Sequence, residues 1–326
     1  MTASRPGLSP ASRIREGRQR PKFDSGLATL ALLLAGVFHA DGGTAQGTDA
    51  LPPGNDALVE VAFVSNRLRE AHPEPGRSYG NELGPLSSGR CVVDIQARSG
   101  RGELVGVSDV DPKETLAGLE PFRGTGLVVY IHGYYEDFDR SCRRAAVFKS
   151  RLGSDLGFLL FSWPANSTPF TYGADVADLE ASTPRFIELL RDLSRLHDPG
   201  TISVIAHSLG TRGLVEALQK APTPAVPLRD LVLIASDMDR EKFLEVLPLL
   251  RKQVSNIALF VSGRDLPLRL SGVVNGGARL GQGGTGPIDD VRVIDVTDYA
   301  TTHLSGHVYH LRNEDVLAQL RELLER

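Results

Sequence analysis

The chain has 326 residues, of which 41% are hydrophobic and 23% are charged. This length and composition are typical of a globular protein that buries one large core or two modest ones. The formal net charge at pH 7 is −4. A protein that binds nucleic acid needs a concentration of positive charge, so we expect no nucleic-acid partner.

Residues 1–45 resemble a secretory signal peptide, in which basic residues precede an apolar run and then small residues. The basic residues nearest to the apolar run are Arg13, Arg15, Arg18, Arg20 and Lys22. The apolar run at 27–38 is shorter than the roughly 20 residues that span a membrane. We therefore predict a periplasmic or secreted protein, with membrane contact only if this segment remains as an uncleaved anchor. Residues 46–326, with 30 basic and 37 acidic residues and a net charge of −7, are expected to form a single domain.

Two cysteines, Cys91 and Cys142, lie beyond this segment. An oxidising compartment permits a disulfide, but the sequence does not define their separation in space, so paired and free cysteines both remain open. Two cysteines are too few for a thiolate metal cluster, which leaves the histidines as candidate metal ligands.

From residue 50 onward, short apolar runs alternate with helical patterns, which is typical of parallel strands joined by crossover helices. The first two runs, 59–65 and 91–97, have no long helix between them and predict an antiparallel pair at the edge of the sheet. The later runs are almost continuously apolar, as buried parallel strands are. They are 127–131, 158–162, 202–206, 231–235, 257–261 and 291–296. The sheet is therefore expected to have about eight strands.

Several helix boundaries are also visible in the sequence. Thr183 followed by Pro184 is typical of an N-cap and first turn, and Asn313 is expected to cap the last helix. Asp239 is expected to cap the helix that follows the strand at 231–235. Seven glycines among the 15 residues at 272–286 predict a mobile loop.

The most informative segment is V-I-A-H-S-L-G-T-R-G at 204–213. An apolar run leads into Ser208, which has a small residue two positions to either side and a helical pattern after it. This is the layout of a nucleophile elbow, in which a strand delivers a serine to a sharp turn before a helix. Gly210 permits a close approach of neighbouring backbone. Ala206 stands where the G-x-S-x-G pattern has its first glycine, a mild departure because alanine has the smallest side chain with a Cβ.

A serine hydroxyl needs a base to remove its proton, and the base needs a carboxylate to hold it. The candidate bases follow the last strand and precede the last helix: His303, His307 and His310. The favoured acid is Asp265, after the strand at 257–261, with Asp237 as the alternative. These positions follow successive strands, and the carboxyl ends of parallel strands converge in one crevice.

An oxyanion site needs backbone N–H donors directed at the developing negative charge. One donor is expected at Leu209, directly after Ser208 and at a helix start. The second is expected at Tyr134, because the strand at 127–131 runs into the turn His132-Gly133.

Together these motifs resemble the α/β-hydrolase superfamily over residues 58–326, in that superfamily's order. The motifs are H-G-Y at 132–134, A-H-S-L-G at 206–210, S-G-R-D at 262–265 and G-H-V-Y at 306–309. N-R at 66–67, F-S-W-P at 161–164 and A-S-D-M-D at 235–239 are similar to a bacterial branch catalogued mainly as hydrolases of unknown function. The resemblance implies a mostly parallel sheet with helices on both faces, and it favours His307 as the base.

A metal site is the rival interpretation of the downstream histidines, since histidines four apart can share a helix face and bind zinc. Gly306 interrupts this segment, however, and no glutamate follows His303 as in H-E-x-x-H. We therefore expect no metal and no cofactor.

The predicted function is a serine hydrolase of carboxylesterase or thioesterase type, acting on a small-molecule or acyl substrate through an acyl-enzyme intermediate. The segment between 235 and 257 has room for about one helix, so no large cap domain is expected. An amidase or peptidase is an alternative. Because a fold does not determine an activity, a non-catalytic binding protein with this fold is another.

Overall fold

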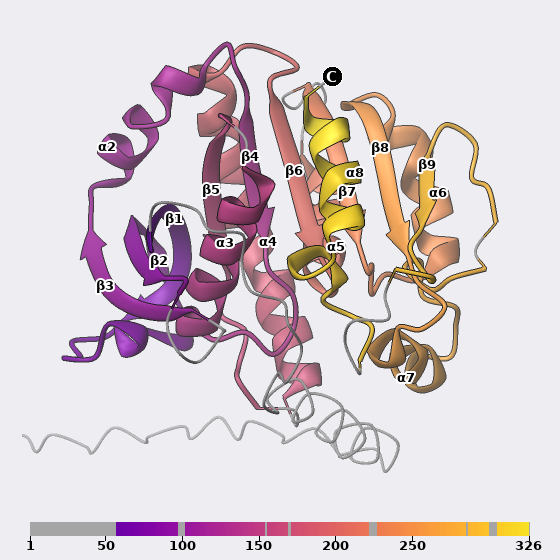
Figure 1. Cartoon of the computed structure of the whole chain (residues 1–326), viewed down its shortest axis with the longest axis horizontal. Coiled ribbons are helices and arrows are strands. Elements are labelled where there is room, and N and C mark those ends of the chain that lie inside the picture. Colours follow the sequence, from indigo (N-terminus) through magenta and orange to yellow (C-terminus); the bar gives the residue numbers. More distant parts are fainter. Residues whose placement is uncertain are drawn as a thin grey trace, which may run out of the picture.

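The computed structural model describes residues 57–96, 102–153, 155–168, 171–221, 227–284, 286–299 and 305–325. These residues form a nine-stranded sheet in the order β3-β2-β1-β5-β4-β6-β7-β8-β9 (Figure 1). The strands are β1 (Leu58–Arg69), β2 (Tyr79–Asp94), β3 (Glu103–Asp109), β4 (Leu127–Ile131), β5 (Gly157–Ser162), β6 (Ile202–His207), β7 (Leu228–Ile234), β8 (Val254–Val261) and β9 (Arg292–Asp295). The predicted signal segment 1–45 and His303 lie outside the described residues.

Helices cover both faces of the sheet, with α3 and α8 on one face and α4, α5 and α6 on the other (Figure 1). The α-helices are α2 (Pro112–Ala117), α3 (Phe138–Leu152), α4 (Tyr172–Leu196), α5 (Gly210–Lys220), α6 (Arg240–Leu250), α7 (Leu266–Asn275) and α8 (Glu314–Leu324). The 3-10 helices are η1 (Pro75–Arg77), η2 (Glu120–Phe122) and η4 (Tyr309–Leu311). The predicted α/β-hydrolase fold is confirmed.

The two hydrophobic cores explain why the central strands are continuously apolar. Along β4, Leu127, Val129 and Ile131 face the core beneath α4, α5 and α6, whereas Val128 and Tyr130 face the core beneath α3 and α8. Successive side chains of a strand point to opposite faces, so a strand covered on both sides has no solvent-facing position.

The predicted antiparallel pair is confirmed, because β1 pairs with β2 in antiparallel fashion and with β5 in parallel fashion. It is not the edge of the sheet, however, since β3 pairs outside β2. The sequence of β3, E-L-V-G-V-S-D, buries only Leu104. An exposed edge strand of this kind has no apolar run by which it could have been predicted.

One other prediction was wrong, and another holds only in part. The helix α4 does not begin at Thr183 but at Tyr172, and it continues through Pro184. At this proline the Thr183 hydroxyl donates to the carbonyl of Leu179, which supplies a polar contact inside the helix. The glycine-rich segment is a loop only in part: α7 extends to Asn275, and in the stretch that follows, Leu280 is completely buried.

Other predictions hold. Asp239 and Asn313 each accept a backbone N–H at the start of a helix, α6 and α8 respectively. The segment between β7 and β8 contains α6 and turns, so no cap domain is inserted there. Cys91 and Cys142 are free thiols, both fully buried, and burial raises the pKa of Cys142 well above its usual value.

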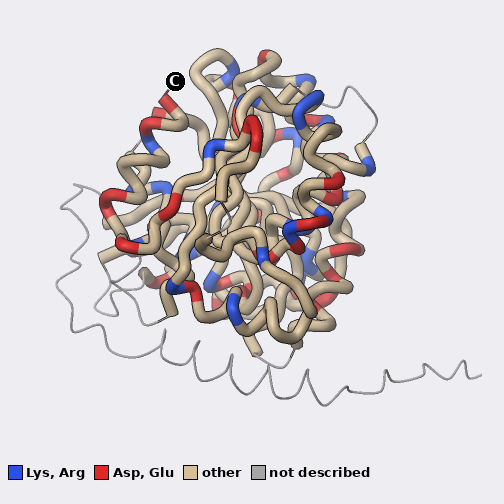
Figure 2. The backbone as a smooth tube through the Cα atoms, turned by 90° about the vertical axis from the view of Figure 1, so that its right-hand side faces the viewer, with Lys and Arg blue, Asp and Glu red and all other residues tan. Residues whose placement is uncertain are grey.

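The surface and the helices add two observations on the described chain. Basic and acidic residues are interspersed along the backbone (Figure 2). Among the described helices, none has both the length and the apolar character that crossing a bilayer demands.

Candidate functional site

Ser208 occupies a sharp turn between β6 and α5. Its φ is +52°, in the left-handed region that a residue with a side chain rarely adopts. The turn is locked at both ends: the Ser208 N–H donates to the carbonyl of Ile234 at 2.9 Å, and its own carbonyl accepts the Thr211 hydroxyl at 2.6 Å. A strained conformation held by such bonds is a feature of functional sites.

Gly210 is required by this turn. A Cβ at this position would lie 2.4 Å from the carbonyl oxygen of His132, which is closer than any side chain tolerates. Ala206, in contrast, is buried in the core, paired with Ile131 on one side and Leu233 on the other. The departure from glycine at Ala206 is therefore accommodated within the packed sheet.

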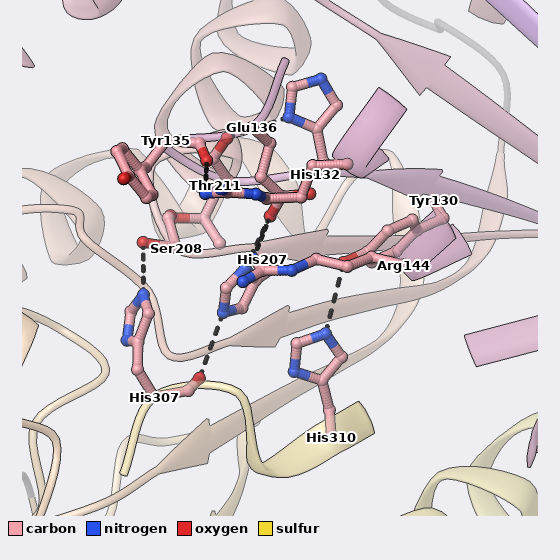
Figure 3. Close-up of polar contacts among 12 residues, drawn as sticks. Tyr130, His132, Tyr135, Glu136, Arg144, His207, Ser208, Thr211, His307 and His310 are labelled. Atoms are coloured by element: carbon pink, nitrogen blue, oxygen red, sulfur yellow. Dashed lines mark hydrogen bonds and ion pairs between the residues drawn. The ribbon is translucent and has the colours of Figure 1, made fainter. Parts of the chain in front are cut away.

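The three side chains predicted to act together lie within hydrogen-bonding distance of one another. The Ser208 Oγ is 2.9 Å from His307 Nε2 (Figure 3). On the other side of the ring, His307 Nδ1 is 2.8 Å from Oδ2 and 3.0 Å from Oδ1 of Asp265. Ser208, His307 and Asp265 are all buried. They form a connected relay of hydroxyl, imidazole and carboxylate.

Asp265 has a second role as the N-cap of α7, because its Oδ1 also accepts the N–H of Leu268 at 3.0 Å. The alternative acid, Asp237, is used differently. Its carboxylate accepts hydrogen bonds from the Tyr172 hydroxyl at 2.8 Å and the Ser271 hydroxyl at 2.5 Å. Of the two aspartates, Asp265 is the one whose carboxylate lies within hydrogen-bonding distance of the His307 imidazole.

The two segments predicted to supply the oxyanion donors both run beside Ser208. Leu209 directly precedes α5 and stands at its N-cap. On the other side, a Cβ added to Gly133 would lie 2.9 Å from the Cβ of Ser208, so the backbone leading into Tyr134 passes close to the nucleophile. The ring of Tyr134 packs edge-on against Tyr172, with centroids 5.4 Å apart.

His132 and Trp163 pack against each other at the start of the loop after β4, which leads to Tyr134. Their rings are stacked at 5.1 Å and 6°, and the Trp163 indole N–H donates to the His132 carbonyl at 2.9 Å. Burial lowers the pKa of His132 to about 3, so the ring stays neutral at physiological pH. Trp163 is completely buried, so it acts as a core residue.

Arg67 is a further buried residue of this region whose role the sequence alone did not reveal. Its guanidinium donates to the carbonyl of Glu136 at 2.7 Å, to the Ser162 hydroxyl at 3.0 Å and to the carbonyl of Ala165 at 3.0 Å. Burial lowers the pKa of Arg67 to about 10. The sequence held one sign of this role, an arginine within an apolar strand. In the structure Arg67 connects β1 to the loop after β4.

Of the downstream histidines, His307 and His310 make different contacts in the structure. His307 belongs to the relay, whereas His310 Nε2 lies 3.3 Å from the Tyr130 hydroxyl. Among the residues that the structure describes, no three His, Cys, Asp or Glu side chains are arranged to hold a metal ion.

Asp175, in the first turn of α4, is a buried carboxylate with one unsatisfied oxygen. Its Oδ1 accepts from the backbone and side chain of Asn166 at 3.2 and 2.6 Å, while its Oδ2 has no hydrogen-bond partner. Burial raises the pKa of Asp175 from 3.8 to about 7. The folded state therefore binds a proton on the Asp175 carboxylate more tightly than the unfolded state does.

We expect Asp175→Asn to stabilise the protein at pH 8 but not at pH 4. Because the folded pKa is the higher one, the stability of the protonated form is lost as pH rises through about 7, and asparagine avoids that loss. The gain at pH 8 is about 4 kcal/mol at most. Thermal unfolding at the two pH values measures it. An equal change in Tm at pH 4 and pH 8 would contradict a raised pKa of Asp175 in the folded state.

Comparison with known proteins gives one family match and several similar structures. A model described as "Alpha/beta hydrolase of unknown function (DUF900)" matches residues 114–323. None of the curated proteins matches significantly. An esterase from Pyrobaculum calidifontis is 10% identical, with 91% of each chain covered and a TM-score of 0.36. An arylesterase is 10% identical, with 93% of this chain and 98% of that chain covered and a TM-score of 0.40. An ester-hydrolase from the metagenome of Lake Arreo is 13% identical, with 93% and 97% covered and a TM-score of 0.40.

Proposed function

The chain belongs to the family of alpha/beta hydrolases whose model spans residues 114–323, and from that premise we propose that it is a serine hydrolase of ester or thioester bonds. The observation that carries the proposal is the unbroken relay from Ser208 Oγ through both ring nitrogens of His307 to Asp265. A serine becomes a nucleophile when a positioned base takes its proton.

In the proposed mechanism, Ser208 Oγ attacks the carbonyl carbon of the substrate while His307 Nε2 takes the hydroxyl proton. Asp265 holds the Nδ1–H of His307 and stabilises the imidazolium that forms. The N–H groups of Leu209 and Tyr134 bind the negative oxygen of the tetrahedral intermediate. His307 then returns the proton to the leaving alcohol or thiol, which leaves the acyl group on Ser208.

The second half of the reaction repeats these roles with water. His307 takes a proton from water, the resulting hydroxide attacks the acyl carbon, and the proton returns to Ser208 as the acid departs. The relay needs no metal or cofactor to move these protons. Because α6 alone connects β7 and β8, a small acyl substrate is favoured over one that needs a large cap for its recognition.

A fluorophosphonate probe tests the proposal directly, because it reacts with an activated serine and stays attached. We expect wild-type protein to be labelled on Ser208, and Ser208→Ala to lose the label while keeping its circular dichroism spectrum. Loss of the label in a folded variant would assign the nucleophile. A series of p-nitrophenyl esters of increasing chain length then defines the acyl preference.

Folded wild-type protein that takes up no label and hydrolyses no ester would overturn the proposal. That result would favour a non-catalytic binding role for the same fold. Hydrolysis of p-nitroanilides in preference to the matched esters would instead assign an amidase.

A further inference from the structure

Beside the relay lies a second group of polar side chains, most of them buried, that the proposed mechanism does not use (Figure 3). We refer to Glu136, Arg144, His207 and His310 as the buried polar cluster, in which Arg144 is the one member that reaches solvent, with 20% of its side chain exposed. They come from the loop after β4, from α3, from the end of β6 and from η4. The cluster therefore joins the loop of the oxyanion site, the nucleophile elbow and the segment that carries His307.

Within this cluster, His207 contacts the segment that carries His307. Its Nε2 is 3.2 Å from the backbone carbonyl oxygen of His307. A carbonyl oxygen can only accept, so Nε2 carries the proton and donates it. The two rings are also packed together, with centroids 4.8 Å apart.

The other side of the His207 ring faces the ion pair of the cluster. Its Nδ1 is 3.9 Å from Glu136, whose carboxylate accepts from Arg144 at 2.8 Å. The pKa of His207 is lowered well below its usual value by burial and by the nearby charges of His310, His307 and Arg144. A neutral ring donates through one nitrogen only, and it adds no positive charge beside His307 when His307 itself becomes an imidazolium.

The cluster is expensive to bury. Three of its atoms have no hydrogen-bond partner: Glu136 Oε2, His207 Nδ1 and His310 Nδ1. Each such atom costs about 1–3 kcal/mol relative to its solvated state. Apolar side chains of similar size would fill the same space without this cost, so stability alone does not account for a histidine at position 207.

Two hydrogen bonds hold the segment that carries His307, one before this residue and one at its own carbonyl. Before His307, the carbonyl of Ser305 accepts the N–H of Leu266 at 3.0 Å, which connects the segment to α7. At His307 itself, the carbonyl is held by His207, the last residue of β6 and the neighbour of Ser208. The second bond therefore links the base and the nucleophile through neighbouring residues of the chain.

We propose that His207 is a positioning residue of this site: its Nε2–H holds the His307 carbonyl and so sets the distance between His307 Nε2 and Ser208 Oγ. The inference rests on the proposed function of Ser208 and His307. A displacement of about 1 Å at a reacting group is enough to lower a rate roughly 100-fold.

Two substitutions of His207 separate the hydrogen bond from packing. In His207→Gln, the side-chain amide reaches about as far as Nε2 and keeps a donor for the His307 carbonyl. In His207→Phe, a ring of similar size remains but the donor is lost. We expect kcat to fall roughly 100-fold in the phenylalanine variant with KM changed less than about threefold, and kcat of the glutamine variant to stay within about fivefold of wild type.

Each kcat is expressed per reactive serine, counted by complete fluorophosphonate labelling, so that a misfolded fraction does not lower it. His197→Phe is the matched control, since His197 is also buried but lies at the end of α4, before β6 begins. We expect this control to retain the wild-type kcat per reactive serine. If His207→Phe does not fold, His207→Asn replaces it, because its shorter amide does not reach the His307 carbonyl and the same loss is expected.

The inference is overturned if the phenylalanine or asparagine variant keeps the wild-type kcat per reactive serine. It is equally overturned if the glutamine variant is as slow as the phenylalanine variant, because then the ring and not its donor matters. Failure of wild-type protein to take up the label is a different result, which removes the proposed function itself.

Discussion

Replacing His307 with alanine is expected to lower kcat for ester hydrolysis about 10⁶-fold. The substitution removes the ring nitrogen that lies 2.9 Å from the Ser208 oxygen and that is proposed to take its proton. The residual rate would come from the oxyanion donors and from substrate binding. Initial rates with p-nitrophenyl acetate at saturating concentration measure the loss.

The double variant Ser208→Ala/His307→Ala is the control for this prediction. A nucleophile and base that act as one unit show strongly non-additive losses, so the double variant should be about as slow as either single variant. Losses that multiply would show that the two residues act independently. A His307→Ala rate within tenfold of wild type would mean that another group serves as base.

Replacing Asp265 with asparagine is expected to lower kcat about 10⁴-fold at neutral pH while leaving the fold intact. The asparagine amide can donate to His307 Nδ1, which favours the tautomer that cannot accept the Ser208 proton. Asparagine is as good an N-cap as aspartate, so the bond that starts α7 is kept. Measured kcat and Tm on the same preparation separate the two roles.

Two further variants sharpen this result. Asp265→Ala should lose activity to a similar extent and, in addition, about 1 kcal/mol of stability with the cap. Asp237→Asn should retain activity within about tenfold, because the Asp237 carboxylate bonds Tyr172 and Ser271. A larger loss in Asp237→Asn than in Asp265→Asn would reverse the assignment of the acid.

Much of the fold was predictable from local pattern, because central strands buried on both faces have to be apolar throughout. The run at 127–131 matches β4 residue for residue. Where tertiary packing overrides local preference, the same reasoning failed. Pro184 lies inside α4 and not at its start, and β3 has too little buried surface to be recognised.

The buried polar cluster illustrates a different limit. Glu136 lies in a loop and Arg144 within α3, and charged residues are normally solvated, so nothing in their local sequence distinguishes them. Glu136 is completely buried because the loop after β4 packs against α3 and the end of β6. Only the packed structure shows that they lie behind His207.

The sequence by itself indicated the class of chemistry: an apolar strand that leads into Ser208, with a small residue two positions to either side, and aspartates and histidines after later strands. What the tertiary structure decided was which of these groups meet. His307 and Ser208 are 99 positions apart and Asp265 and His307 are 42 apart, and contacts over such separations depend on strand order and packing rather than on local spacing. For the same physical reason Asp237, the alternative acid that the sequence left open, is bonded to Tyr172 and Ser271.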